Sequence, residues 1–323
     1  MSDKPVLVVT RKLPAAVEER LQRDYRPKLN PDDRCYSGDE LIELCNGADG
    51  IVPCHTEQLC ADIIERLPGS IKIIANFSVG VDHCDLDAAR KRGITVTNTP
   101  EVLNEATAEI ALLLILGASR RGGEGERMVR SKKWRDWSPD FMVGVQSTGK
   151  NLGIIGMGRV GQVLARKARD GLGMNIHYHN RNRLSPDQEA DAIFHDSVEE
   201  LLPNCDVLSL HCPATPETIG LLNSERISLL PDGAVVVNTA RGALIDDAAL
   251  VAALCSGKLW AAGLDVYNNE PVDIHPGYRD LDNVFLLPHI GSATRETRDA
   301  MGFRALDNLD AYFAGEEPGD RVA

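Results

Sequence analysis

The segment NLGIIGMGRVGQVLARKARDGLGMNIHYHNRNR, residues 151–183, decides the fold of this chain. It opens with an apolar run, turns at the glycines of GMGRVG, continues with helix-forming residues and ends in a second apolar run. A strand, a glycine-rich turn, a helix and a strand in this order are typical of a unit that binds a dinucleotide. The segment therefore predicts an α/β unit with a dinucleotide site at the turn.

The glycines of this turn have separate physical roles. Gly156 permits the tight turn, Gly158 lets the backbone approach a pyrophosphate, and Gly161 allows the helix to pack closely on the strand. The free N–H groups and the dipole at the start of the helix, where Arg159 and Val160 lie, favour an anion. The alternatives are a purely structural turn and a methyltransferase-type site with a similar loop.

The residues after the second strand bear on the choice of dinucleotide. An NAD site places Asp or Glu about 20 residues beyond the turn to accept hydrogen bonds from the ribose. This chain has Asn180, Arg181, Asn182 and Arg183 there, and no acidic residue occurs from 174 through 186. Guanidinium groups bind phosphate through forked hydrogen bonds, so the sequence favours NADP(H), with NAD(H) as the alternative. A solvated basic loop, or an arginine stacked on adenine, would leave the preference mixed.

The length and the pattern of the chain predict two domains. Its 323 residues exceed a single core of about 100 to 200 residues. Short β-rich runs alternate with amphipathic runs through the first hundred residues and again from residue 151, which predicts two helix-covered parallel sheets. We expect a Rossmann-type doubly wound sheet of six or seven strands in 99–289. A smaller flavodoxin-like substrate domain is expected in 1–98 plus 290–323, to which an amphipathic C-terminal helix returns.

The segment NTPEVLNEATAEIALLLILGASRR between the two patterns is expected to form one long helix. Thr99 is its expected N-cap, Pro100 its first helical position, and Glu101 lies beside the positive end of the helix dipole. The interior of the segment is apolar almost all round, so we expect burial between layers or between subunits.

Composition excludes several classes of partner. The net charge is −13, which gives no general attraction for nucleic acid or for an anionic membrane. The longest apolar run, 110–119, is too short to cross a bilayer, and the first residues do not resemble a secretory signal. Eight scattered cysteines without a CxxC pair favour free thiols in a cytoplasmic protein. No set of histidine, cysteine and acidic residues has zinc-ligand spacing, so no metal is expected.

Three side chains that can carry chemistry follow predicted strands. They are Arg241 after AVVVNTA, Glu270 in GLDVYNNEP and His289 after NVFLLP. Ligands of open parallel sheets bind outside the carboxyl ends of the strands, so these positions are candidates for an active site. Taken singly, each has a simpler explanation as a helix cap, a surface turn residue or a structural histidine.

Four ordered motifs, GIIGMGRVGQ, VVVNTARGALID, AAGLDVYNNEP and LLPHIGSAT, resemble those of the D-2-hydroxyacid dehydrogenases. The segments NFSVGVDHCDL and ITVTNTPEVLNEATAEIAL extend the resemblance to the first half of the chain. The TPEVL segment, the tryptophan-containing loop and the NRNR run are most similar to glyoxylate/hydroxypyruvate reductases. The resemblance implies an enzyme that reduces small 2-oxoacids, glyoxylate to glycolate and hydroxypyruvate to D-glycerate, with a nicotinamide cofactor.

The resemblance also implies catalytic roles. His289 would donate a proton to the carbonyl oxygen of a 2-oxoacid as hydride arrives, which suits an imidazole. Glu270 would bind the other ring nitrogen, orient His289 and favour its charged form. Arg241 would bind the substrate carboxylate and polarise the carbonyl group.

Binding residues are implied in the same way. The backbone N–H groups of Val79 and Gly80, with Ser78 adjacent, would receive the substrate carboxylate, although an ordinary strand-to-helix turn also explains this loop. Asp265 would take the nicotinamide carboxamide. The other cofactor positions implied by the resemblance are Thr107, Gly156, Gly158, Arg159, Val160, Cys212, Pro213, Thr218, Thr239, Ala240, His289 and Gly291.

Trp137 would border the substrate site of the partner subunit in a homodimer. The pair Trp134 and Trp137 is equally typical of an interface without a catalytic meaning. Two other functions stay open, a dinucleotide-sensing corepressor-like protein without activity and a dehydrogenase that acts on phosphite or on larger 2-oxoacids. The presence of Arg241, Glu270 and His289 favours catalysis, and Glu270 argues against formate dehydrogenases, whose known members lack this glutamate.

Overall fold

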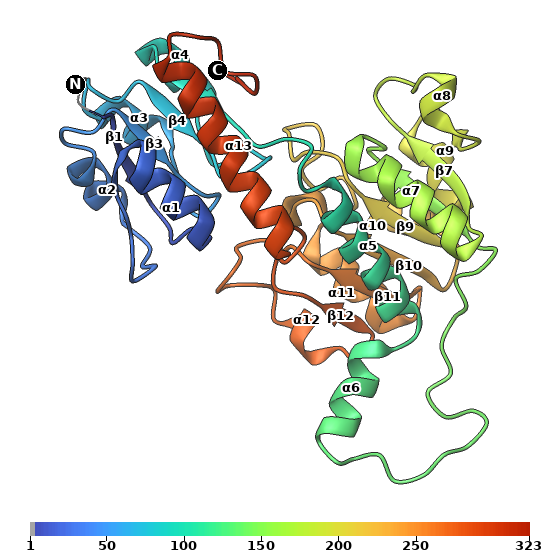
Figure 1. The fold of residues 1–323 in the computed structure, drawn as a ribbon. Helices are drawn as coiled ribbons and strands as arrows, with labels where there is room; N and C mark the ends of the chain where they lie inside the picture. The colour runs from blue at the N-terminus through green and yellow to red at the C-terminus, as the bar shows by residue number, and fades with distance from the viewer. Residues whose placement is uncertain (1–3) are drawn as a thin grey trace. The chain divides into compact units, whose positions relative to one another are not determined.

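The computed structural model describes residues 4–323. The chain divides into two compact units. Unit 1 comprises Met1–Leu103 and Ser292–Ala323, and unit 2 comprises Asn104–Gly291. Each unit has its own parallel sheet with helices on both faces (Figure 1).

The sheet of unit 1 has five parallel strands in the order β2-β1-β3-β4-β5. This is the flavodoxin-like strand order. The strands are β1 (Val6–Val9), β2 (Arg26–Lys28), β3 (Gly50–Val52), β4 (Ile73–Ala75) and β5 (Thr95–Thr97). The sequence pattern did not predict β2, because RPK carries no apolar signal. Its position at the edge of the sheet tolerates a proline, which cannot donate to a neighbouring strand.

The C-terminal helix completes the core of unit 1. The helices of this unit are α1 (Ala15–Asp24), α2 (Gly38–Leu44), α3 (Ala61–Arg66), α4 (Leu86–Arg92) and α13 (Arg295–Phe313). Met301, Leu306 and Leu309 of α13 are buried in one cluster with Leu7 of β1. A side chain at Gly302 would collide with Val17 of α1, so these two helices pack closely.

The sheet of unit 2 has seven parallel strands in the order β12-β11-β10-β9-β6-β7-β8. Counted from β6, this contains the strand order of a Rossmann fold, which confirms the expected doubly wound sheet. Every strand expected in this part of the chain is present. The strands are β6 (Asn151–Ile155), β7 (Asn175–His179), β8 (Ile193–Phe194), β9 (Val207–Leu210), β10 (Ala234–Asn238), β11 (Leu259–Leu264) and β12 (Val284–Leu286).

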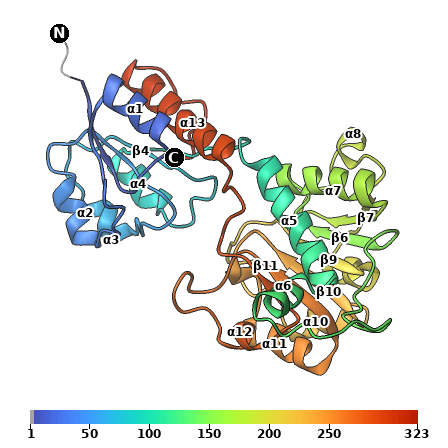
Figure 2. The same cartoon turned by 60° about the horizontal axis from the view of Figure 1, so that its bottom comes forward.

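Helices cover both faces of this second sheet (Figure 2). One face packs on α5 (Asn104–Ser119) and α7 (Arg159–Leu172), and the other packs on α10 (Ser224–Leu229) and α11 (Asp247–Ser256). Side chains alternate along the buried strands, so that neighbouring residues of β10 enter opposite clusters. The remaining short elements are α6 (Gly122–Arg130), α8 (Pro186–Glu189), α9 (Val198–Leu201), η1 (Leu202–Asn204), η2 (Gly242–Leu244) and α12 (Gly277–Asp280).

The expected start of the long helix is wrong. Helix α5 begins at Asn104, and Thr99 and Pro100 lie outside it. Glu101 has φ +73°, a left-handed conformation that a helix cannot contain. Its carboxylate lies 3.2 Å from Nη1 of Arg304 on α13. Residue 101 is therefore engaged in a tertiary ion pair and does not form part of the helix start.

The cysteines form no cross-links. All eight lie in the described part of the chain and are free thiols, as expected. Cys45, Cys84 and Cys205 are buried, and burial raises the pKa of each of these thiols to about 12. Within residues 4–323, no helix has the length and apolar character needed to cross a bilayer.

Candidate active site

The glycine-rich turn joins the carboxyl end of β6 to the start of α7. Gly156 has φ +90°, and an added Cβ there would lie 2.5 Å from the backbone nitrogen of Cys212. An added Cβ at Gly161 would lie 2.9 Å from the carbonyl oxygen of Gly156. At Gly158 the nearest atom would be 4.0 Å away. The turn therefore leaves open space in front of the helix, which fits the close approach of a pyrophosphate.

The two arginines after β7 have different surroundings. Arg183 donates from Nε to Oε1 of Glu189 at 2.7 Å and from Nη2 to Oε2 at 3.1 Å. Arg181 is exposed and makes no hydrogen bond or ion pair within residues 4–323. The two guanidinium groups therefore differ, since a carboxylate of the chain holds Arg183 and none holds Arg181 within residues 4–323. The sequence reasoning considered acidic residues only up to residue 186 and therefore did not include Glu189, which lies three residues further along the chain.

The loop after β10 carries Arg241. The side chain of Asn238 accepts a hydrogen bond from the N–H of Ala240 at 2.9 Å and donates to the carbonyl oxygen of Arg241 at 2.8 Å. A side chain at Gly242 would collide with the backbone of Tyr267. The loops after β10 and β11 are therefore packed backbone against backbone, which positions Arg241 beside the loop that contains Glu270.

Glu270 and His289 are in direct contact. Oε1 of Glu270 pairs with Nδ1 of His289, and Oε2 accepts a hydrogen bond from the N–H of Tyr267 at 2.8 Å. The hydroxyl of Tyr267 lies 2.9 Å from the carbonyl oxygen of Leu264 and 2.7 Å from that of Leu287. Tyr267 therefore ties the end of β11 to the end of β12, and the strands hold the acidic and imidazole groups in register.

The turn 289–291 is held by Asp265. The N–H of Ile290 donates to Oδ1 of Asp265 and the N–H of Gly291 donates to Oδ2, each at 2.8 Å. Asp265 is 1% exposed, and this burial raises its pKa. His289 has φ +53°, an uncommon conformation for a residue with a side chain. Thr107 of α5 also reaches this turn, since its hydroxyl donates to the carbonyl oxygen of Gly291 at 3.2 Å.

His211 lies between the other expected cofactor positions and was missed by the sequence reasoning. Its Nε2 is 2.8 Å from Oγ of Ser209, and its Nδ1 is 3.4 Å from Oγ1 of Thr239. Burial lowers the pKa of His211 to about 4, so the ring is neutral at pH 7. In the neighbouring loop the hydroxyl of Thr218 donates to the carbonyl oxygen of Pro213 at 2.7 Å. The sequence could have indicated His211, because this residue directly follows strand β9 at the same edge of the sheet as the glycine turn.

The expected substrate loop of unit 1 follows β4. Oγ of Ser78 donates to the carbonyl oxygen of Gly80 at 2.8 Å, and Nδ2 of Asn98 donates to that of Val79 at 2.8 Å. In the described part of the chain, the N–H groups of Val79 and Gly80 donate no hydrogen bond. The loop thus offers two backbone donors to a ligand, whereas the hydroxyl of Ser78 is used in shaping the turn.

Arg298, in the first turns of α13 in unit 1, was also missed. Burial lowers the pKa of its guanidinium group. Among residues 4–323 this guanidinium group has no hydrogen bond or ion pair. A partly buried charge without a partner is costly, so this arginine is a candidate to bind an anion. The sequence signal was its position nine residues after His289, in SATRETR.

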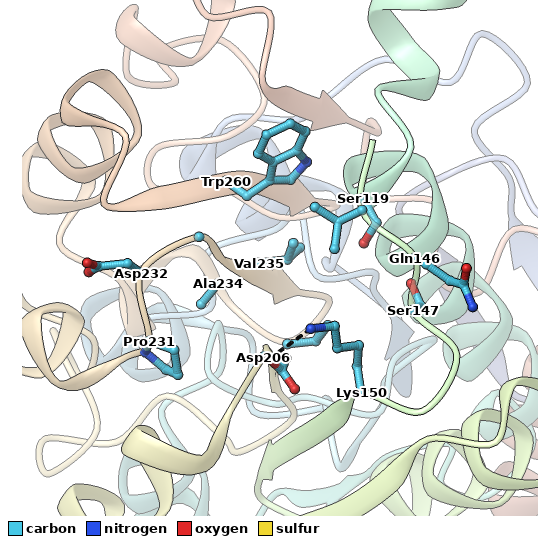
Figure 3. Close-up of a pocket in the computed structure, with 13 residues that line it drawn as sticks. Ser119, Gln146, Ser147, Lys150, Asp206, Pro231, Asp232, Ala234, Val235 and Trp260 are labelled. Carbon is cyan, nitrogen blue, oxygen red and sulfur yellow. Dashed lines mark ion pairs between the residues drawn. The ribbon is translucent and has the colours of Figure 1, made fainter. Parts of the chain in front are cut away.

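A pocket of about 250 Å³ lies elsewhere in unit 2 (Figure 3). It opens at the amino ends of β9 and β10, beside the ion pair of Lys150 and Asp206 at 3.5 Å. None of the expected site residues lines it. Arg241, Glu270 and His289 instead follow strands at the carboxyl edge of the unit 2 sheet, where parallel sheets bind their ligands.

Comparison with known proteins assigns the family. Residues 112–291 match the model of the D-isomer specific 2-hydroxyacid dehydrogenase, NAD binding domain. The chain is 45% identical over 319 residues to glycerate dehydrogenase from Hyphomicrobium methylovorum, and the alignment covers 98% of both chains. The chain belongs to the D-isomer specific 2-hydroxyacid dehydrogenases. The dehydrogenase is therefore an oxidoreductase, and the resemblance seen in its motifs is confirmed.

Two solved structures resemble the dehydrogenase along its whole length. A glyoxylate reductase from Paecilomyes thermophila has a TM-score of 0.89 at 36% identity, covering 100% of this chain and 99% of its own. An NADPH-dependent glyoxylate/hydroxypyruvate reductase from Sinorhizobium meliloti, solved with NADP and malonate, has a TM-score of 0.87 at 32% identity. That match covers 99% of the dehydrogenase and 97% of the reductase. Both support the two-domain α/β fold.

Proposed function

We propose that the dehydrogenase reduces glyoxylate to glycolate and hydroxypyruvate to D-glycerate, with NADPH preferred to NADH. The observation that carries this proposal is the contact between Glu270 and His289, held beside Arg241 at the carboxyl edge of the unit 2 sheet. The names of the similar proteins, a glycerate dehydrogenase and two glyoxylate reductases, support this class of substrate.

His289 is the proposed acid. A bound nicotinamide supplies the hydride, and the chain supplies the proton. Because Glu270 holds Nδ1, Nε2 is the ring nitrogen that gives its proton to the keto oxygen of the substrate. The carboxylate of Glu270 orients the imidazole ring, and the N–H of Tyr267 keeps that carboxylate in place. In the reverse reaction, the same nitrogen takes the proton back.

Arg241 is the proposed carboxylate ligand of unit 2. A guanidinium group binds a carboxylate through two parallel hydrogen bonds, which orients the substrate as well as holding it. The same charge stabilises the negative charge that develops on the keto oxygen. In unit 1 the N–H groups of Val79 and Gly80 are the proposed hydrogen-bond donors to a carboxylate.

The cofactor is proposed to lie along the carboxyl edge of the unit 2 sheet. Gly156 and Gly158 would receive the pyrophosphate at the start of α7, and Arg181 and Arg183 would bind a 2′-phosphate. The NADP complex of the Sinorhizobium meliloti reductase supports this choice. The remaining proposed contacts are with Thr107, Arg159, Val160, Asn180, Asn182, Cys212, Pro213, Thr218, Thr239, Ala240, Asp265, His289 and Gly291.

The test is the initial rate of reduction of four 2-oxoacids, glyoxylate, hydroxypyruvate, pyruvate and phenylpyruvate, with NADPH and with NADH. We expect the highest kcat/KM with glyoxylate or hydroxypyruvate and NADPH. A higher value with phenylpyruvate would support the alternative of a larger substrate. A complete lack of turnover, with tight binding of the dinucleotide, would support a sensing protein instead.

We also infer that the dehydrogenase is a homodimer. Helix α6 and the segment that follows it project from unit 2 (Figure 1). They expose large apolar side chains, with Val129 61%, Trp134 54%, Trp137 69% and Val143 54% accessible. So many exposed apolar groups in one short segment are typical of a subunit interface. Sedimentation equilibrium should give twice the chain mass, and Trp137→Ser should shift the protein toward the monomer.

A further inference from the structure

Arg183 is already engaged by a carboxylate of its own chain. Nε and Nη2 of Arg183 meet the two oxygens of Glu189 at 2.7 and 3.1 Å, a forked pair. A guanidinium group binds a phosphate with this same fork. The carboxylate therefore occupies the edge of Arg183 that a 2′-phosphate would use.

Glu189 has a second anchor that does not depend on Arg183. The hydroxyl of Tyr178 donates to Oε1 of Glu189 at 2.5 Å and accepts from the N–H of Leu184 at 3.1 Å. Tyr178 is fully buried in β7, and the side chain of Glu189 is only 11% exposed. Hydrogen bonds from Arg183 and Tyr178 hold the pKa of Glu189 below its usual range. The carboxylate is therefore fixed in place and charged at neutral pH.

Arg181 differs from Arg183 in this respect. The side chain of Arg183 is 64% exposed but is held on one edge by Glu189 and on one face by the ring of Phe194, whose centroid is 5.5 Å from its guanidinium carbon. Arg181 forms no hydrogen bond or ion pair among residues 4–323, and its charge acts on the carboxylate of Glu217 without direct contact. The two arginines of NRNR are therefore not equivalent toward a phosphate.

We propose that Glu189 limits the selectivity of the dehydrogenase for NADPH by competing with the 2′-phosphate of this cofactor for Arg183. Arg181 is the phosphate ligand that is always available, and Arg183 joins it only when the ion pair with Glu189 opens. NADH makes no such demand, because its ribose carries hydroxyl groups that need no guanidinium group. The proposal rests on the proposed use of NADPH, and it makes Glu189 an element that limits the preference for that cofactor.

The test uses Glu189→Gln in the full-length enzyme. Glutamine keeps an acceptor for the hydroxyl of Tyr178 and removes the charge that holds Arg183. Adenosine 2′,5′-bisphosphate and 5′-AMP, which differ only in the 2′-phosphate, are titrated by calorimetry. We expect the variant to bind the bisphosphate about threefold to fivefold more tightly than the wild type, the range of an exposed ion pair, and to bind 5′-AMP equally well.

Glu199→Gln is the matched control. It removes one negative charge from the same unit by uncoupling an exposed pair with Arg226, whose Nε lies 2.8 Å from Oε1 of Glu199. It should leave the affinity for the bisphosphate unchanged. An equal gain in both variants would show a general charge effect and would overturn the proposal. Thermal unfolding of both variants checks that the fold is retained.

A double-mutant cycle separates the two arginines. Arg183→Ala should weaken binding of the bisphosphate more in the Glu189→Gln background than in the wild type, whereas Arg181→Ala should weaken it in both. If the wild type prefers the bisphosphate to 5′-AMP and Glu189→Gln changes nothing, the role of Glu189 is overturned and the use of NADPH stands. If neither protein prefers the bisphosphate, both proposals fail.

Discussion

The backbone N–H of His289 donates to the carbonyl oxygen of Asp265 at 2.8 Å, and the next two N–H groups bind the carboxylate of the same aspartate. Three consecutive donors thus converge on one residue. This arrangement holds His289 in a left-handed conformation that few residues with side chains adopt. Asp265 therefore fixes the direction in which the imidazole of His289 leaves the backbone.

Asp265→Asn should lower both stability and activity. The amide replaces one acceptor oxygen with an NH₂ group, so one buried N–H of Ile290 or Gly291 loses its partner. Leaving such a donor unsatisfied costs about 1 to 3 kcal/mol in the free energy of unfolding. Urea unfolding and steady-state kinetics measure the two effects. A variant with wild-type stability would show that the carboxylate does not hold the turn.

His289→Ala should nearly abolish turnover while binding of the dinucleotide survives. Loss of a positioned acid typically reduces kcat by about 10²- to 10⁴-fold. Fluorescence titration with NADPH gives the binding constant, and stopped-flow absorbance gives the hydride transfer rate. Glu270→Gln should give a smaller loss of kcat, because the ring is still held but the imidazolium loses its carboxylate. Full activity of His289→Ala would exclude the proposed role.

Arg241→Lys should not restore the function that Arg241→Ala loses. A lysine keeps the charge but lacks the planar fork that binds a carboxylate with two hydrogen bonds. We expect both variants to raise KM and lower kcat, since the group contacts the substrate in the ground state and in the transition state. Kinetics with glyoxylate at saturating NADPH give both constants. Wild-type kinetic constants in Arg241→Lys would show that Arg241 acts only through its positive charge.

Removal of both guanidinium groups after β7 should weaken the use of NADPH much more than the use of NADH. The double variant Arg181→Ala with Arg183→Ala should raise KM for NADPH far more than KM for NADH, because only NADPH carries the 2′-phosphate. Each KM is measured at a saturating concentration of the 2-oxoacid. Equal changes for both cofactors would contradict the assignment of these arginines to the phosphate.

His211 should make the dehydrogenase less stable in mild acid. Its pKa falls from 6.5 to about 4 on burial, so between these values the unfolded chain binds a proton that the folded chain does not. Stability therefore decreases as the pH falls from about 6.5 toward about 4. His211→Gln removes this proton uptake. Urea midpoints at pH 7 and pH 5 should differ less in the variant than in the wild type, and equal differences would contradict the buried neutral state.

Local patterns were sufficient for most of the fold. Apolar runs predicted six or seven strands in unit 2, where the structure has seven, and a parallel sheet in unit 1, and GMGRVG predicted the turn whose geometry excludes side chains at Gly156 and Gly161. Strands and glycine turns depend on residues that are close together in the chain, so they can be predicted from a single sequence. Strand β2 was not predicted, because an edge strand exposes its polar residues and needs no run of apolar residues.

The sequence alone determined an α/β chain with a glycine-rich dinucleotide turn, and it placed Arg241, Glu270 and His289 after the ends of strands. The tertiary structure decided which of these groups meet. The contact between Glu270 and His289, which the family resemblance implied, forms in the structure, whereas the hydrogen bonds of Asp265 to the turn 289–291 and the pair of Glu189 with Arg183 were not expected. Contacts of this kind depend on loops brought together by different strands, and no periodicity along the chain encodes the distance between their side chains.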